Sequence, residues 1–120
     1  IKDMAYILRD KSFAFALRII RLYKHLTEDK KEFVLSKQIL RSGTSIGANV
    51  REGKNAQSNS DFISKYSIAL KEADETQYWI ELLYASEFID DNAYKSLNDD
   101  INELISLLTS SIKTAKNNGK

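Results

Sequence analysis

The sequence predicts an all-α protein that folds as an antiparallel up-down-up-down four-helix bundle. The 120 residues contain no Pro and only four Gly, and these two residue types disfavour helix interiors most strongly. Apolar residues recur at helical spacing in four segments joined by short polar connections, the pattern of antiparallel neighbours in a bundle. The length fits a single domain, residues 1–120, with one small core.

The four helices are expected at residues 6–26, 33–55, 61–88 and 91–116. The first is apolar on two nearly opposite faces. One face carries Tyr6, Phe13, Leu17 and Ile20, and the other carries Leu8, Phe15, Ile19, Leu22 and Leu26. A helix with two apolar faces is covered by more than one neighbour.

The second predicted helix has an unusual stripe of small and polar residues beside its ordinary apolar stripe. The small polar stripe consists of Gln38, Ser42, Ser45, Asn49, Glu52 and Gly53. Gly43 and Gly47 also lie inside this helix, where each costs about 1 kcal/mol relative to Ala. We interpret the stripe as an assembly element that permits close helix approach and satisfied polar contacts. The sequence leaves open whether it faces the bundle core or a neighbouring subunit.

The third predicted helix follows a polar segment at 54–60, where Ser60 is a candidate cap. It carries a second apolar stripe of Ile68, Trp79 and Leu82, with Glu75 in its middle. Asp90 and Asp91 give a start signal for the last helix.

The surplus apolar faces predict a homo-oligomer, because a monomer rarely exposes such a large patch. The interface residues expected on this argument are Phe15, Leu22, Ile68, Trp79 and Leu82. The alternative is irregular packing that buries both stripes within one bundle.

Charge is distributed unevenly along the chain, although the net charge is only +1. Residues 1–57 hold twelve Lys/Arg against six Asp/Glu, while residues 58–120 hold six against eleven. This asymmetry predicts a polarised surface or electrostatic pairing between the halves.

The first predicted helix carries a basic stripe of Lys11, Arg18, Arg21 and His25, which Lys24 extends. Lys11, Arg18, Arg21 and Lys24 are the candidate contacts to RNA or DNA phosphates, without sequence readout. The alternative is a solvated helix face. Few aromatic residues interrupt this stripe, so base stacking is not indicated.

Catalytic chemistry finds little support in the residues. Cys is absent, His25 is the one His, and the Glu-x-x-His pattern of di-iron bundles does not occur. No cofactor and no metal are expected. Arg41 and Glu75 are interpreted as a structural ion pair or polar network that fixes helix register or subunit orientation. The alternatives are a catalytic or ligand-binding carboxylate and simple solvent exposure. With no apolar run of about 18 residues, no membrane contact is expected, and the location is expected to be cytoplasmic.

Two spaced motifs together resemble a known bacterial family. They are Gln38-x-x-Arg41-Ser42-x-x-Ser45-Ile46-x-x-Asn49-x-x-Glu52-Gly53 and Tyr66-x-x-Ala69-x-x-Glu72-Ala73-x-Glu75-Thr76-x-Tyr78-Trp79. The family is that of proteins encoded in intervening sequences of 23S ribosomal RNA, also called the S23 ribosomal protein family. The resemblance implies a four-helix bundle that assembles into pentameric rings, without enzymatic activity. A related protein, the accessory protein of diversity-generating retroelements, is a basic pentamer that binds nucleic acid and a reverse transcriptase.

The hypothesis from sequence is a non-enzymatic, pentameric interaction or scaffold protein that binds RNA or DNA through the basic residues of its first helix. The alternative is a purely structural protein-binding module with no nucleic-acid contact. The near-neutral net charge distinguishes this chain from the strongly basic retroelement protein.

Overall fold

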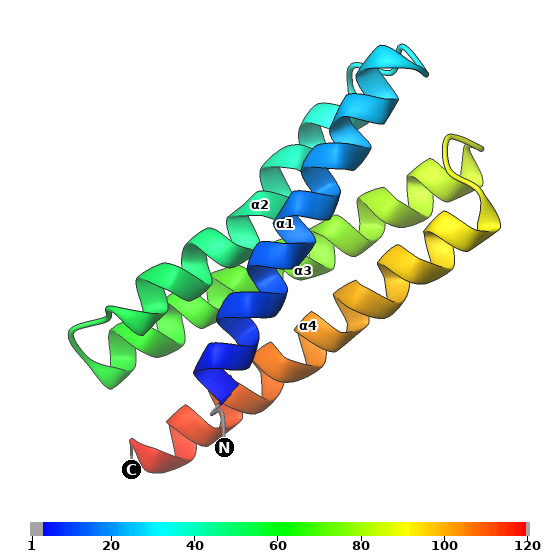
Figure 1. The fold of residues 1–120 in the computed structure, drawn as a ribbon. Coiled ribbons are helices and arrows are strands. Elements are labelled where there is room, and N and C mark those ends of the chain that lie inside the picture. Colours follow the sequence, from blue (N-terminus) through cyan, green and yellow to red (C-terminus); the bar gives the residue numbers. More distant parts are fainter. Residues whose placement is uncertain (1–3, 120) are drawn as a thin grey trace.

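The computed structural model describes residues 4–119 and contains, within them, four helices and no strand (Figure 1). Their bounds are α1 Met4–Glu28, α2 Leu35–Lys54, α3 Asn59–Ala85 and α4 Asp91–Asn118. The predicted all-α four-helix bundle is therefore confirmed. The helix bounds differ from the predicted ones by at most three residues.

The helices form an elongated bundle of 49 × 22 × 22 Å. The helix α2 packs against both α1 and α3, and α4 packs against α3 and more lightly against α1. Accordingly α1 lies diagonally across from α3, and α2 from α4. Figure 1 shows α1 and α4 diverging toward the carboxyl end of α1, which leaves α2 as the main neighbour of α1 there.

The core takes large apolar side chains from all four helices. Those that are fully buried are Leu8, Phe15, Ile19, Leu26, Ile39, Ile46, Tyr66, Ile80, Leu83, Ile101, Leu104 and Leu108. The inner face of α1 is therefore the stripe that contains Phe15, which is only 1% exposed. The expectation that Phe15 faces outward in an oligomer interface is wrong.

The other apolar face of α1 is exposed to solvent instead. Tyr6, Phe13, Leu17 and Ile20 all lie on this outer stripe of α1. The two stripes are similarly apolar, so the residues that they meet on neighbouring helices determine which stripe is buried. Ile19, on the inner stripe, lies directly against Gly43 of α2.

The ends of α3 and α4 are capped by side chains and local hydrogen bonds. Ser58, rather than Ser60, caps α3, because its hydroxyl accepts from the Asp61 N–H at 3.0 Å. Asp90 caps α4 as predicted, accepting from the Ala93 N–H at 2.8 Å. Helix α3 ends at Ala85, three residues before the predicted end, because Glu87 adopts a left-handed φ of 68°. The N–H groups of Glu87 and Phe88 then bond back to Tyr84 and Leu83.

The start of α2 is capped by Glu32, although Glu is not a usual cap residue. Its carboxylate accepts from the backbone N–H groups of Val34, Leu35 and Ser36 at 3.2, 3.0 and 2.7 Å. Burial raises the pKa of Glu32, but these hydrogen bonds together outweigh burial, and the pKa is lowered from its usual value.

Replacing Glu32 should destabilise the protein in a pH-dependent way. We expect Glu32→Ala to lower the free energy of unfolding by about 1 kcal/mol near neutral pH, the usual value of a helix cap. Because the folded pKa is lowered, the stabilisation exists above the unfolded pKa and disappears as pH falls through the folded pKa. Urea unfolding of both proteins across acidic and neutral pH should show their stabilities converging at low pH.

The matched control is Glu81→Ala, which removes an exposed carboxylate near the carboxyl end of α3. It should change stability by less than about 0.5 kcal/mol. A constant difference between wild type and Glu32→Ala at every pH would contradict the capping role.

None of the helices described within residues 4–119 has an apolar stretch long enough to cross a membrane.

Candidate functional site

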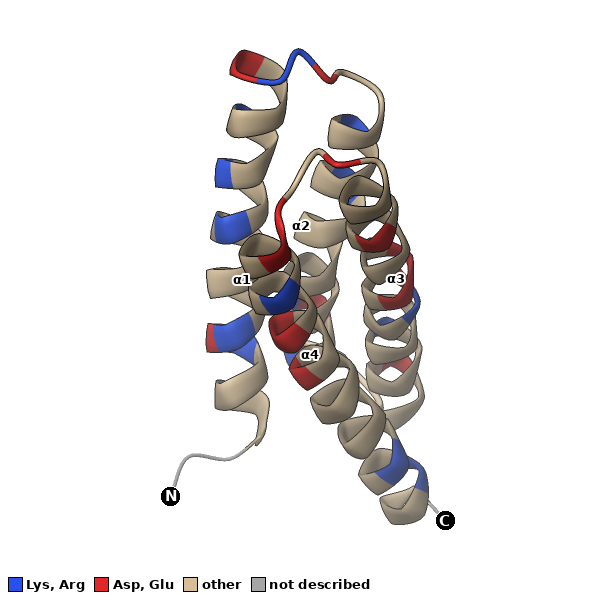
Figure 2. Ribbon diagram, turned by 90° about the vertical axis from the view of Figure 1, so that its right-hand side faces the viewer, with Lys and Arg blue, Asp and Glu red and all other residues tan. Residues whose placement is uncertain are grey.

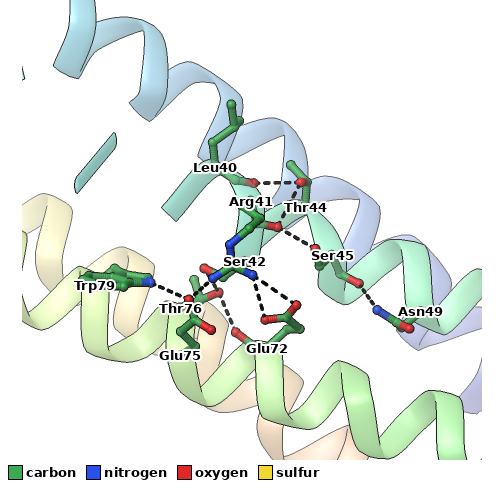
Figure 3. A network of polar contacts seen from close by, with 10 residues as sticks. All are labelled: Leu40, Arg41, Ser42, Thr44, Ser45, Asn49, Glu72, Glu75, Thr76 and Trp79. Carbon is green, nitrogen blue, oxygen red and sulfur yellow. Dashed lines mark hydrogen bonds and ion pairs between the residues drawn. The ribbon is translucent and has the colours of Figure 1, made fainter. Parts of the chain in front are cut away.

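Ser42, in the small polar stripe of α2, faces α3 of the same chain (Figure 3). Ser42 and Thr76 are both buried, and Thr76 Oγ1 lies 2.9 Å from Ser42 Oγ. The same hydroxyl lies 2.7 Å from the carbonyl oxygen of Glu72. The question left open by the sequence is thus settled for Ser42, which contacts the bundle core.

An ion-pair network continues this contact toward the surface. The guanidinium of Arg41 lies 3.4 Å from both carboxylate oxygens of Glu72 and also pairs with Glu75. Trp79 Nε1 donates to the same Glu75 carboxylate at 2.9 Å. Arg41 and Glu75 therefore form an ion pair between α2 and α3, and their structural role stays a prediction. Because the Arg41 side chain is half exposed, the pair orients α2 on α3 more than it adds stability.

The remaining polar residues of the stripe have separate roles. Ser45 Oγ donates to the Arg41 carbonyl at 2.6 Å, and Asn49 Nδ2 donates to the Ser45 carbonyl at 2.9 Å. Both bonds stay within α2 and satisfy the side chains locally. Glu52 pairs with Lys65 of α3 at 3.3 Å. Gln38 is exposed and does not join the network.

Two glycines of α2 permit close helix approach, as the sequence predicted. A Cβ at Gly43 would lie 2.8 and 2.9 Å from side-chain carbons of Ile19 on α1. A Cβ at Gly53 would lie 2.7 Å from the ring of Tyr66 on α3. Gly47 differs, since the nearest atom to its Cβ position is Ser12 Oγ at an ordinary 3.4 Å.

Alanine at Gly53 and at Gly47 should therefore have opposite effects. Gly53→Ala drives a methyl group into the buried Tyr66 ring, and overpacking of this kind costs about 1–3 kcal/mol. The space beside Gly47 can hold a methyl group, so Gly47→Ala should stabilise the helix by up to about 1 kcal/mol. Urea unfolding of the two variants measures both effects. Equal effects of the two substitutions would show that close approach does not require Gly53.

Two of the predicted nucleic-acid contacts are paired with acidic residues of α4. Lys11 Nζ lies 3.2 Å from Glu103, and Arg18 Nη1 lies 2.7 Å from Asp100. Figure 2 shows basic residues of α1 beside acidic residues of α4. The expected electrostatic pairing between the two halves of the chain is therefore present. Arg21 and Lys24 are exposed and make no ion pair within residues 4–119.

Most of the residues predicted for an oligomer interface are at least partly covered within the chain. Leu22 and Trp79 pack against the core, and Leu82 is half-buried. Ile68 alone of the five is an exposed large hydrophobic residue. Sequence reasoning missed the outer stripe of α1 as the exposed face. The sequence signal for this exposed face is Lys24. It is a charged residue on the same side of the helix, four residues after Ile20.

A groove of about 670 Å³ runs between α1 and α2 beside the outer stripe. Phe13, Ala16, Gly47 and Ala48 form its apolar lining. Its remaining lining residues are Arg9, Asp10, Ser12, Thr44, Arg51 and Glu52. The groove is open and apolar, and it lies where Gly47 leaves the backbone of α2 uncovered.

The described part of the chain, residues 4–119, contains no candidate metal site. No three His, Asp or Glu side chains among them could together hold a metal ion. His25 Nδ1 lies 2.9 Å from Asp29, an exposed pair one helical turn apart.

Comparison with known proteins identifies the family. A family model described as 23S rRNA-intervening sequence protein matches residues 5–110. The chain belongs to this family. A crystal structure of a protein of unknown function from the S23 ribosomal protein family of Bacteroides thetaiotaomicron is similar, with a TM-score of 0.91 and 57% identity. The match covers 92% of this chain and 99% of that one. A comparison with curated proteins gave no match.

Proposed function

We propose that this member of the 23S rRNA-intervening sequence protein family is a non-enzymatic homo-oligomeric interaction protein. The observation that carries the proposal is the outer stripe of α1, which exposes Tyr6, Phe13, Leu17 and Ile20 in one row. Phe13 is 59% exposed. Contiguous exposed apolar residues of this kind mark interaction surfaces.

A second copy of the chain is the occupant that suits this surface. On the opposite side of the bundle, α3 exposes Ile68 and Tyr78. Because α1 and α3 lie diagonally, their outer faces point away from each other. A contact between two unlike faces joins subunits head-to-tail. Such an assembly closes into a ring when the rotation between neighbouring subunits divides a full turn evenly. The basic first half and acidic second half of the chain favour the same unlike pairing. A pentamer is the ring size that the family resemblance implies.

Nucleic-acid binding through α1 is a second candidate function. Arg21 and Lys24 are the predicted contacts that remain exposed and unpaired within residues 4–119, and a ring would repeat them. Lys11 and Arg18 would have to give up their ion pairs with α4 carboxylates before they could bind phosphates. The loss of these ion pairs reduces the free energy gained from binding nucleic acid. The alternative remains a structural module whose partner is a protein.

Light scattering of the native protein tests self-association. We expect a mass several times the 13.7 kDa of one chain. The variant Phe13→Glu with Leu17→Glu should shift that mass toward one chain, because it places two charges in the apolar contact.

The matched control is Phe33→Glu, since Phe33 is 52% exposed but lies in the connection before α2. It should leave the native mass unchanged. A wild-type protein that scatters light as a single chain would refute the proposal, and so would the same mass for the α1 variant as for wild type.

A further inference from the structure

Three cationic side chains from two helices meet at the end of the bundle where α1 begins and α2 ends. Arg9, Arg51 and Lys54 line a recess of about 200 Å³. Arg9 and Lys54 also lie on the ring of Tyr6, with Arg9 Cζ 4.6 Å and Lys54 Nζ 5.8 Å from the ring centroid. More than forty positions separate Arg9 from the other two cations, so only the fold brings them together.

This cluster differs from the basic residues of α1 in its charge balance. Within residues 4–119, neither Arg51 nor Lys54 makes an ion pair. Arg9 pairs with its neighbour Asp10 at 3.2 Å. Glu52, the next carboxylate on α2, is held by Lys65. Positive charge therefore exceeds negative charge in the recess, and a bound anion would relieve the repulsion between the cations.

We propose that Arg9, Arg51 and Lys54 form a binding site for phosphate groups, and that its occupant is the backbone of a nucleic-acid strand. The guanidinium groups of Arg9 and Arg51 can each bind a phosphate with two parallel hydrogen bonds. Lys54 supplies a third positive charge. The cation–π contacts with Tyr6 restrict Arg9 and Lys54, so less conformational entropy is lost on binding.

The exposure of the cations favours a long polyanion over a small phosphate compound. Arg51 and Lys54 are exposed, and Arg9 is half-buried. Ala5, Val50 and Asn55 complete the lining, and none of them is a buried polar group that could recognise a small ligand. Exposed phosphate contacts are individually weak, so useful affinity requires repetition along a strand. That repetition rests on the proposed self-association, while the site itself lies within one chain.

The site should bind phosphates without reading bases. Its ligands are charged groups suited to the backbone, and the Tyr6 ring is already occupied by Arg9 and Lys54. Contacts of this type fix a strand without sequence discrimination. We therefore expect RNA and DNA strands of different sequence to bind with similar affinity.

Fluorescence anisotropy with a short labelled single-stranded RNA of mixed sequence tests the proposal. Arg51→Glu with Lys54→Glu should weaken binding by about tenfold or more at moderate salt, because two attractive contacts become repulsive. The matched control is Lys30→Glu with Lys37→Glu, which reverses two exposed cations at the opposite end of the bundle and makes the same change in net charge. It should leave affinity within about threefold of wild type.

A neutral variant, Arg51→Gln with Lys54→Gln, avoids new repulsion at the end of α2. It should reduce the slope of log affinity against log salt by at least about 1.4, since each single-strand phosphate contact contributes about 0.7. An unchanged slope would contradict direct phosphate contact by these residues.

Light scattering of each variant separates this proposal from self-association. An Arg51/Lys54 variant that keeps the wild-type mass and loses RNA binding supports the site. Equal losses in both charge-reversal variants would overturn it, because binding would then follow net charge alone. If the wild-type protein is oligomeric but does not bind RNA, the phosphate-site proposal is overturned while the self-association proposal stands. Inorganic polyphosphate serves as a second probe, and binding of polyphosphate without RNA would refute the nucleic-acid assignment.

Discussion

The close approach of α2 to its two neighbours is the constraint on which the rest of the structure depends. Gly43 lets Ile19 of α1 sit against the α2 backbone, and Gly53 does the same for Tyr66 of α3. Glycine inside a helix lowers its stability by about 1 kcal/mol, so both positions accept a local cost for tight packing. At this spacing Ser42 reaches Thr76, and Arg41 reaches the acidic residues of α3.

This internal packing also decides which surfaces remain available for partners. Because Ile19 is held at Gly43, the outer stripe of α1 is left in solvent, together with the groove over Gly47. The same geometry distributes the cations. Lys11 and Arg18 turn toward α4 and are neutralised there, while the cluster of Arg9, Arg51 and Lys54 keeps excess positive charge. The proposed assembly surface and the proposed anion site thus adjoin at Tyr6, which belongs to the outer stripe and also contacts Arg9 and Lys54.

The sequence was sufficient for features that depend on local pattern. Four helices, the Asp90 cap and the close approach at the glycines follow from periodicity and residue type. It could not choose the inner stripe of α1, because both stripes are similarly apolar and the choice depends on a neighbour on another helix. Nor could it show that Arg18 is neutralised, since its partner Asp100 lies 82 residues away. The Glu32 cap was missed because Glu is not among the residue types that commonly cap the start of a helix.

A double-mutant cycle between Ile19 and Gly43 tests the central contact most directly. Ile19→Ala removes the side chain that meets the Cβ position of residue 43, so Gly43→Ala should become harmless or stabilising in that background. Urea unfolding of the four proteins should then give a favourable coupling free energy of about 1 kcal/mol or more. Effects that add to within about 0.5 kcal/mol would show that the two residues are independent, and would contradict the account of how α2 positions α1.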